Sequence, residues 1–217
     1  MEVKVLKNIL SANDLMAEEN RKVFASKGIF SLNVMASPGS GKTTLIMETI
    51  KRLKNEFAIG VIEGDTAGSL DAERIGAENV PVVQINTGGG CHLEAQMVNS
   101  ALKAMPLDDI KLLIVENVGN LICPGEFELG VSKKVVLMST PEGDNKPYKY
   151  PLMFKIADAV IVSKIDLMPY VNFKLDDFTK AVRSINDKAA IIPLSAQTGE
   201  GFDKWIEWLK KNLTNAL

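Results

Sequence analysis

The sequence predicts an α/β fold in which a mostly parallel sheet of about seven strands is covered by helices on both faces. Short, continuous apolar runs alternate with segments of helical spacing, a pattern typical of parallel sheets with two buried faces. In addition, a glycine-rich turn joins a strand-like run, residues 30–34, to a helical run, residues 45–50. This order is the setting of a phosphate-binding P-loop. We therefore predict a P-loop NTPase fold, with residues 1–217 as one domain.

The composition is that of an ordinary globular domain. The 217 residues are 46% hydrophobic and 24% charged, with a formal net charge of −2. This length suffices for one well-buried core, and the small charge argues against a nucleic-acid or membrane surface as partner. No apolar run is long enough to cross a bilayer. The two cysteines beside a nucleotide site favour the cytoplasm, where they remain thiols rather than forming a disulfide.

The expected elements follow in chain order. Residues 4–27 have helical spacing and end at Gly28, so residues 1–28 are expected to form a helical extension in front of the nucleotide domain. Pro81 limits its strand to a strand start or a sheet edge. Strands are expected at residues 30–34, 58–62, 80–85, 111–116, 135–138, 159–162 and 190–194. Helices are expected at residues 45–50, 93–105, 151–157, 174–185 and 202–213, and a loop at 140–151.

The P-loop candidate is the segment ASPGSGKTT, residues 36–44. Its glycines let backbone N–H groups point at a phosphate, and the following helix adds its positive N-terminal end. Lys42 is expected to reach the β- and γ-phosphates, and the Thr43 hydroxyl to be a ligand of Mg²⁺. Ala36 replaces the first glycine of the G-x-x-x-x-G-K-S/T pattern, at a position that closes the strand. The predicted phosphate-binding residues are Gly39, Ser40, Gly41, Lys42, Thr43 and Thr44.

Acidic residues near the ends of two further strands are candidates for Mg²⁺ binding and hydrolysis. Glu116 is followed after three residues by Gly119, whose backbone amide is expected to sense the γ-phosphate. Asp65 is expected near Mg²⁺ and the attacking water, so Lys42, Asp65 and Glu116 are the predicted catalytic residues. Asp71 is equally well explained as a second such carboxylate or as a helix N-cap. No glutamine or arginine is evidently poised for catalysis, so we expect slow unaided hydrolysis, on the order of 10⁻⁴ s⁻¹ as in unassisted Ras.

The segment SKID, residues 163–166, predicts that the base is guanine. A carboxylate at Asp166 accepts hydrogen bonds from guanine N1–H and N2–H₂, whereas adenine leaves it unpaired, which disfavours the wrong base strongly. The Lys164 stem is expected to lie along the ring. Ser195 and Ala196 follow the last strand and offer a backbone N–H to guanine O6.

Two other classes of nucleotide-binding enzyme fit the sequence less well. An ATPase of the deviant P-loop kind needs a second lysine near the loop start, where this chain has Ser37. A kinase acting on a small molecule is disfavoured by the guanine motif. Ser163 replaces the usual asparagine of that motif, so we expect weaker bracing of the P-loop from this side.

A second candidate site combines thiols and an imidazole. The single histidine, His92, is adjacent to Cys91, one of two cysteines, on a glycine-rich loop before a predicted helix. We expect the helix N-terminus to lower the pKa of Cys91 and favour its thiolate. Cys123 lies in a polar loop. Such ligands suit Zn²⁺, Ni²⁺ or copper, and three side chains leave a fourth position for water, a partner or a second copy of the chain. Core packing remains the alternative for each cysteine.

The spacing between the two sites suggests how they communicate. Cys123 is four residues beyond Gly119, so a γ-phosphate contact at Gly119 would move a segment that carries a metal ligand. Loops ordered by a γ-phosphate and released on hydrolysis are a known switching device. The hypothesis is that nucleotide state controls metal release.

Taken together, these motifs resemble the hydrogenase maturation GTPase family HypB, which belongs to the metal-chaperone P-loop GTPases. The resemblance covers nearly the whole chain. It rests on residues 37–43, Gly64 and Asp65, residues 71–74, Thr87 and Gly88 with Cys91 and His92, residues 116–121 with Cys123 and Pro124, and residues 163–166.

The resemblance implies a metal site and its partners. Cys91, His92 and Cys123 would bind Ni²⁺ or Zn²⁺ at a homodimer interface promoted by GTP. Nickel would pass to the hydrogenase large-subunit precursor, with a HypA-like nickel metallochaperone as partner. The urease accessory GTPases are also similar, but their metal motif is Cys-Pro-His, and Gly125 follows Cys123 and Pro124 here. A GTP-dependent protein-binding switch with inert cysteines remains the alternative function.

Overall fold

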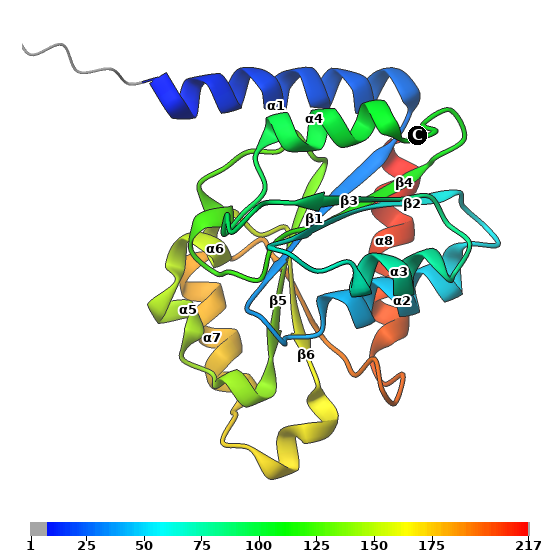
Figure 1. The fold of residues 1–217 in the computed structure, drawn as a ribbon. Helices are drawn as coiled ribbons and strands as arrows, with labels where there is room; N and C mark the ends of the chain where they lie inside the picture. The colour runs from blue at the N-terminus through cyan, green and yellow to red at the C-terminus, as the bar shows by residue number, and fades with distance from the viewer. Residues whose placement is uncertain (1–7, 217) are drawn as a thin grey trace, which may run out of the picture.

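The computed structural model describes residues 8–216 and shows a single central sheet (Figure 1). Its strand order is β3-β2-β4-β1-β5-β6-β7, and every registered pair in the described chain is parallel. The α/β prediction of about seven strands is therefore confirmed. The strands are β1 Phe30–Ala36, β2 Ile59–Asp65, β3 Val82–Asn86, β4 Leu112–Glu116, β5 Lys133–Ser139, β6 Ala159–Ser163 and β7 Ala190–Pro193.

Alternate residues of the central strands face two separate cores. Leu32 of β1 and Ile114 of β4 belong to the core beneath one face, whereas Met35 and Val115 belong to cores beneath the other. Because both faces are covered, β1 and β4 are buried along their whole length. This explains the apolar run of β4 up to Glu116, whereas β1 also buries two polar residues, Ser31 and Asn33.

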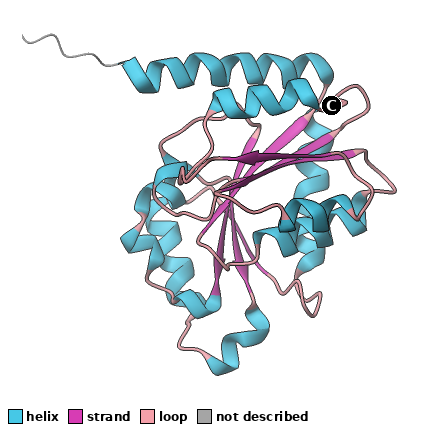
Figure 2. Cartoon of the chain, viewed as in Figure 1, coloured by secondary structure: helices cyan, strands magenta, loops and turns pink. Residues whose placement is uncertain are grey.

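Helices cover both faces of the sheet, as Figures 1 and 2 show. One layer contains α2 Lys42–Leu53, α3 Leu70–Gly76 and α8 Phe202–Ala216. The other contains α1 Asn8–Lys27, α4 Ala95–Ala104, α6 Pro151–Ile156 and α7 Leu175–Ile185. Buried Trp205 anchors α8, since its Nε1 donates to Thr49 Oγ1 of α2 over 2.9 Å. No helix among the described residues combines the length and apolar character needed to span a membrane.

Several predicted boundaries need adjustment. β3 starts at Val82, two residues later than predicted, and Pro81 stands directly before this edge strand, as its missing N–H requires. α4 begins at Ala95 rather than at residue 93. The expected loop at 140–151 is wrong, because it contains the 3₁₀ turn Thr140–Glu142 and the short helix α5 Lys146–Lys149. Ser139 and Glu142 form a capping box that starts this turn.

The N-terminal helix α1 lies on α4 (Figure 1). It ends at Lys27, and Gly28 follows with φ +61°, as the sequence predicted. The predicted helical residues 4–7 fall outside the described residues. Asn20 is fully buried, and its Nδ2 donates to the carbonyls of Ala95 (2.9 Å) and Leu129 (3.0 Å). Its Oδ1 accepts from Asn99 Nδ2 over 2.9 Å. One amide thus joins α1 to two separate segments of the nucleotide-binding part.

We predict that Asn20→Ala lowers the free energy of unfolding by about 1–3 kcal/mol, because it leaves the Leu129 carbonyl and the Asn99 amide buried without this partner. Urea unfolding measures the change. The control is Asn55→Ala at an exposed position, which we expect to stay within about 0.5 kcal/mol of the unsubstituted protein. An equally small effect of Asn20→Ala would show that α1 is held by other contacts.

Candidate nucleotide and metal sites

All the predicted nucleotide residues except Thr43 line two cavities at the carboxyl ends of the central strands. The first, of about 300 Å³, lies on the side of β6 and β7. Predicted residues that line it are Ser40, Gly41, Thr44, Lys164, Asp166, Ser195 and Ala196. The second, also of about 300 Å³, lies on the side of β2 and β4. Predicted residues that line it are Gly39, Lys42, Asp65, Glu116 and Gly119.

The P-loop has the backbone form that anion binding requires. Ala36 is the fully buried last residue of β1, which explains why a small residue other than glycine fits there. Gly39 and Gly41 adopt φ of +73° and +98°, values that side chains disfavour. Helix α2 begins at Lys42, and no side chain of the described residues caps its first turn. Its N–H groups are therefore open to a phosphate.

Oxygen groups converge around the Thr43 hydroxyl. It lies 2.9 Å from Glu116 Oε1 and 3.0 Å from Asp71 Oδ2. The second oxygen of Glu116 is buried without a hydrogen-bond partner. A hydroxyl with two carboxylates is a ligand set that suits Mg²⁺. Asp65 lines the same cavity, but its carboxylate accepts hydrogen bonds from Thr66 N (2.6 Å) and Gly68 N (3.1 Å) of its own loop.

Asp71 and Glu63 also belong to the second cavity, although the sequence did not predict a definite role for either. The N-cap alternative for Asp71 is wrong, because the N-cap of α3 is Ser69, and Asp71 lies in the first turn with its carboxylate on the Thr43 hydroxyl. Glu63, which the sequence analysis missed, is paired in register with Glu116 and is only 3% exposed. Burial, then the charges of Glu116, Asp65 and Asp71, raise the pKa of Glu63 to about 7. The available signal was a carboxylate directly after the apolar run of residues 59–62 in the same strand.

Glu116 experiences a similar electrostatic environment. Burial raises its pKa to about 7, although the Lys42 charge and the Thr43 hydrogen bond act in the opposite direction. Two buried carboxyl groups on adjacent strands therefore face one cavity with Lys42. Such a site gains from a cation that neutralises the carboxylates, which agrees with the ligand set around Thr43.

On the base side, the P-loop is braced by direct hydrogen bonds. Lys164 Nζ donates to the Gly39 carbonyl over 2.7 Å, and Ser163 Oγ donates to the Ser40 carbonyl over 2.8 Å. The serine expected to weaken this bracing thus bonds to the loop directly. Lys164 has φ +58°, which turns the chain into the 3₁₀ segment Ile165–Tyr170 that carries Asp166.

Glu142 is a second residue that the sequence analysis missed. Its Oε1 accepts from Ser40 Oγ (2.7 Å) and from Ser139 N (2.9 Å). Burial raises the pKa of Glu142, but hydrogen bonds from Ser37, Ser139 and Ser40 outweigh it, so the pKa lies below its usual value. Its position in an apparent loop hid it, because the capping box forms only once β5 ends at Ser139.

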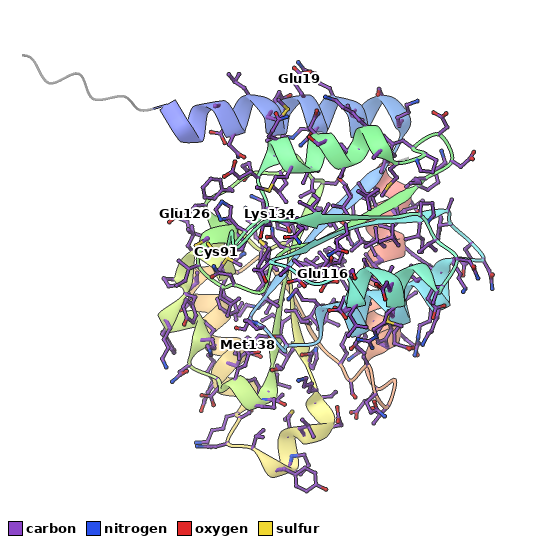
Figure 3. The ribbon with its side chains drawn as sticks, in the orientation of Figure 1. Glu19, Cys91, Glu116, Glu126, Lys134 and Met138 are labelled. Atoms are coloured by element: carbon purple, nitrogen blue, oxygen red, sulfur yellow. The ribbon has the colours of Figure 1, made fainter. Side chains whose placement is uncertain are left out.

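The predicted thiol and imidazole residues come together in space. Cys91, His92 and Cys123 offer donor atoms that all lie within 4.8 Å of one another, and they are the one such group found among the described residues. Cys91 Sγ lies 3.6 Å from His92 Nδ1. The His92 ring stacks on Phe127 with centroids 3.9 Å apart, and its Nε2 is buried without a hydrogen-bond partner. Figure 3 labels Cys91 in the loop before α4 and Glu116 at the end of β4.

The expectation for the Cys91 pKa is wrong. A hydrogen bond with Cys123, then burial and the charge of Cys123, raise the pKa of Cys91. Helix α4 begins only at Ala95, too far along the chain to act on Cys91 as a first-turn residue. The neighbouring thiol dominates because the two sulfurs share one small region.

Comparison with known proteins decides the family. The family described as CobW/HypB/UreG, nucleotide-binding domain, matches residues 31–193. The hydrogenase maturation factor HypB of Escherichia coli K12 is 47% identical over 210 residues, covering 97% of this chain and 72% of that protein. The chain belongs to the HypB family. The predicted resemblance is thus confirmed.

Solved HypB structures confirm the P-loop NTPase fold. HypB from Archaeoglobus fulgidus has a TM-score of 0.89 and 39% identity, covering 94% of this chain and 100% of that one. HypB from Helicobacter pylori in complex with nickel has a TM-score of 0.89 and 38% identity, covering 94% and 96%. This HypB-family chain is therefore a nucleotide-binding member of a family of hydrogenase maturation factors.

The buried carboxyl groups predict a pH dependence. Because the folded pKa of Glu63 is about 7 and its usual value is 4.5, the stability that Glu63 contributes is present below pH 4.5 and is lost as pH rises through 7. Glu63→Gln cannot ionise, so we expect it to be about 1–3 kcal/mol more stable than the unsubstituted protein at pH 8 in EDTA, and equally stable at pH 4. Urea unfolding across this pH range measures the difference.

The control for this pH dependence is Glu207→Gln at an exposed position of α8, for which we expect no difference at either pH. A Glu63→Gln variant that is less stable than the unsubstituted protein at pH 8 would contradict the charge repulsion inferred here.

Proposed function

We propose that this chain is a GTPase that binds Ni²⁺ or Zn²⁺ through Cys91, His92 and Cys123 and couples GTP turnover to nickel delivery for nickel–iron hydrogenase maturation. The observation that carries this proposal is the convergence of three soft donor atoms within 4.8 Å, on loops adjoining the nucleotide cavities. Thiolate and imidazole donors favour nickel or zinc over Mg²⁺. The nickel complex of the Helicobacter pylori relative supports the same assignment.

Nucleotide binding follows from the two cavities. The open N–H groups at the start of α2 and the Lys42 ammonium neutralise the phosphates, which would span the P-loop between the cavities. Asp166 would accept hydrogen bonds from guanine N1–H and N2–H₂, and the Ser195–Ala196 backbone would donate one to guanine O6. All three residues line the first cavity. The 2.7 Å bond from Lys164 to Gly39 holds the base wall against the phosphate loop.

Hydrolysis would depend on the charged groups that line the second cavity. Thr43, Glu116 and Asp71 form the oxygen set for Mg²⁺, with Asp65 at the rim. When bound, Mg²⁺ supplies positive charge that stabilises the β- and γ-phosphate oxygens. Lys42 would stabilise the same oxygens, and Asp65, which lines the same cavity, would orient the attacking water. No arginine or glutamine lines the second cavity among the described residues, in keeping with slow turnover.

The metal site calls for further ligands. Three protein donors leave one position of a tetrahedral site open, and a second copy of the chain can fill it. We therefore propose a homodimer promoted by GTP, with the metal near its interface. A HypA-like nickel metallochaperone and the hydrogenase large-subunit precursor are the proposed partners. Their exchange reactions would use the exposed Cys91 thiol.

Metal titration tests the metal role. We predict that Cys91→Ser weakens Ni²⁺ and Zn²⁺ binding by at least about tenfold, because even the loss of an outer-sphere partner costs that much. Competition with a chromogenic chelator measures the affinity. Asn86→Ala, at the end of β3 just before that loop and outside the donor group, should bind as the unsubstituted protein does. Equal affinity in Cys91→Ser would favour the protein-binding switch with inert cysteines.

Base selection is tested at Asp166. We predict that Asp166→Asn weakens GDP binding by about 10- to 100-fold, because a charged acceptor of two hydrogen bonds is lost. The same variant should favour xanthine nucleotides relative to guanine nucleotides. Isothermal titration with GDP and xanthosine diphosphate measures the switch, and Asp177→Asn on α7 serves as control. Unchanged GDP affinity in Asp166→Asn would contradict the assigned base pocket.

A further inference from the structure

Two asparagine side chains join residues 117–122, the segment after β4 that contains Gly119, to the loop that carries Cys91 and His92. Residues 117–122 are called the sensing segment below, because Gly119 is the residue expected to contact the γ-phosphate. We propose that Asn117 and Asn120 are positioning residues that make the geometry of the metal site depend on the nucleotide. The inference deepens the proposed function and rests on it. It assigns the coupling to specific side-chain hydrogen bonds, in addition to the short chain path from Gly119 to Cys123.

At its nucleotide end, this segment lies directly against the P-loop. A Cβ atom added to Gly119 would meet Pro38 Cα and Cγ at 3.0 Å, so the two backbones are in close contact. The N–H of Asn117 donates to the Val34 carbonyl of β1 over 3.0 Å, which fixes where the segment begins. A phosphate bound by the P-loop would therefore contact or displace Gly119 without an intervening layer.

Asn117 provides the buried link. It is 1% exposed, and its Oδ1 accepts from the N–H of Leu93 over 3.0 Å. Its Nδ2 donates to Asn33 Oδ1 over 3.1 Å, which holds the amide in this orientation. Leu93 is itself fully buried and immediately follows His92. The imidazole-bearing residue is thus attached to the segment through one hydrogen bond and one peptide unit.

Asn120 provides the second link, closer to the thiols. Its Nδ2 donates to the Cys91 carbonyl over 3.2 Å, while its Oδ1 accepts from the Ile122 N–H over 2.8 Å. One amide therefore contacts the backbone of Cys91 on one loop and of the residue before Cys123 on the other. The relative position of the two thiols depends on this amide.

The loop before these links is a glycine turn closed by local hydrogen bonds, from the Gly90 N–H to the Thr87 carbonyl and from Thr87 Oγ1 to the Gly90 carbonyl. Gly88, Gly89 and Gly90 precede Cys91, and the first two adopt φ of +61° and +99°. When the hydrogen bonds of both Asn117 and Asn120 are present, the donor atoms of Cys91, His92 and Cys123 come together only when the sensing segment is in one position. Without the Asn120 link, the glycine loop can follow Cys123 independently, so the metal is held similarly in both nucleotide states. Loss of the link should therefore reduce coupling, which is a free-energy difference between the two states.

The experiment compares metal affinity with GDP and with a non-hydrolysable GTP analogue. Ni²⁺ dissociation constants are measured by chelator competition in each state, and their ratio is the readout. Asn120→Asp keeps the acceptor for Ile122 N–H but loses the donor to Cys91. Asn86→Asp is the control, since it adds the same charge at the end of β3, directly before the glycine loop, and keeps its bond from Gly88 N–H. Thermal unfolding verifies that each variant is folded.

We expect a ratio of at least about tenfold in the unsubstituted protein and in Asn86→Asp, falling at least about threefold towards one in Asn120→Asp. Added charge near the metal acts on both nucleotide states, so it cancels in the ratio. A ratio of one in the unsubstituted protein would overturn the proposed function and this inference with it. A ratio of at least about tenfold in the unsubstituted protein, together with an unchanged or larger ratio in Asn120→Asp, would overturn this inference alone.

A second pair of variants tests the hydrogen bond from Leu93 N–H to Asn117, one keeping the acceptor and the other removing it. Asn117→Asp retains the acceptor for Leu93 N–H and should keep most of the coupling ratio, whereas Asn117→Leu removes it and should lower the ratio at similar volume. Equal ratios in these two folded variants would overturn the role of Asn117. A merely structural role would change stability in both without separating their ratios.

Discussion

The position of β4 between β2 and β1 is the constraint on which both candidate sites depend. Backbone pairing with β1 brings Glu116 beside the first turn of α2, where its carboxylate meets Thr43. Pairing with β2 brings the same residue beside Glu63. The chain that leaves β4 must then pass the P-loop before it reaches Cys123. A displaced β4 would separate the oxygen set and the donor set together.

Charge explains why the second cavity can respond to a ligand. Glu63 and Glu116 both have a buried oxygen without a hydrogen-bond partner, and burial raises both pKa values to about 7. Their ionisation is therefore costly until positive charge arrives, and Lys42 alone does not offset that cost. A cation and a nucleotide together would change the electrostatic balance at the end of β4. The conformation of the following segment is then sensitive to what the cavity contains.

The helical extension has a place in this arrangement. Asn20 of α1 donates hydrogen bonds to the carbonyls of Ala95, at the start of α4, and of Leu129, which follows the 3₁₀ turn Cys123–Gly125. Asn13 accepts from the Ala95 N–H over 2.9 Å and donates to the Glu128 carbonyl over 2.8 Å. These amides hold the far ends of the two ligand-bearing segments. Under the proposed coupling, movement caused by the nucleotide would be confined to the stretches between α1 and the P-loop.

Much of this organisation is readable in the residues alone. Apolar strands, left-handed glycine positions and the Lys42–Thr43 pair depend on local periodicity and backbone preference, so the fold and the P-loop could be predicted. Cys91, His92 and Cys123 could be chosen as ligands because their chemistry is distinctive and scarce in the chain. Pro81 indicated an edge strand because it lacks an N–H.

Tertiary structure decided what depends on partners distant in the chain. Glu63 looked like one polar residue in a strand until register set it opposite Glu116. The pKa of Cys91 was predicted in the wrong direction because Cys123 approaches it from another loop. Asn117 and Asn120 belong to the motif 116–121 that supports the resemblance, but their roles could not be predicted, since their bonds to Leu93 and Cys91 span 24 and 29 residues. Local sequence determines backbone and ligand chemistry, whereas burial and hydrogen-bond partners are properties of the folded chain.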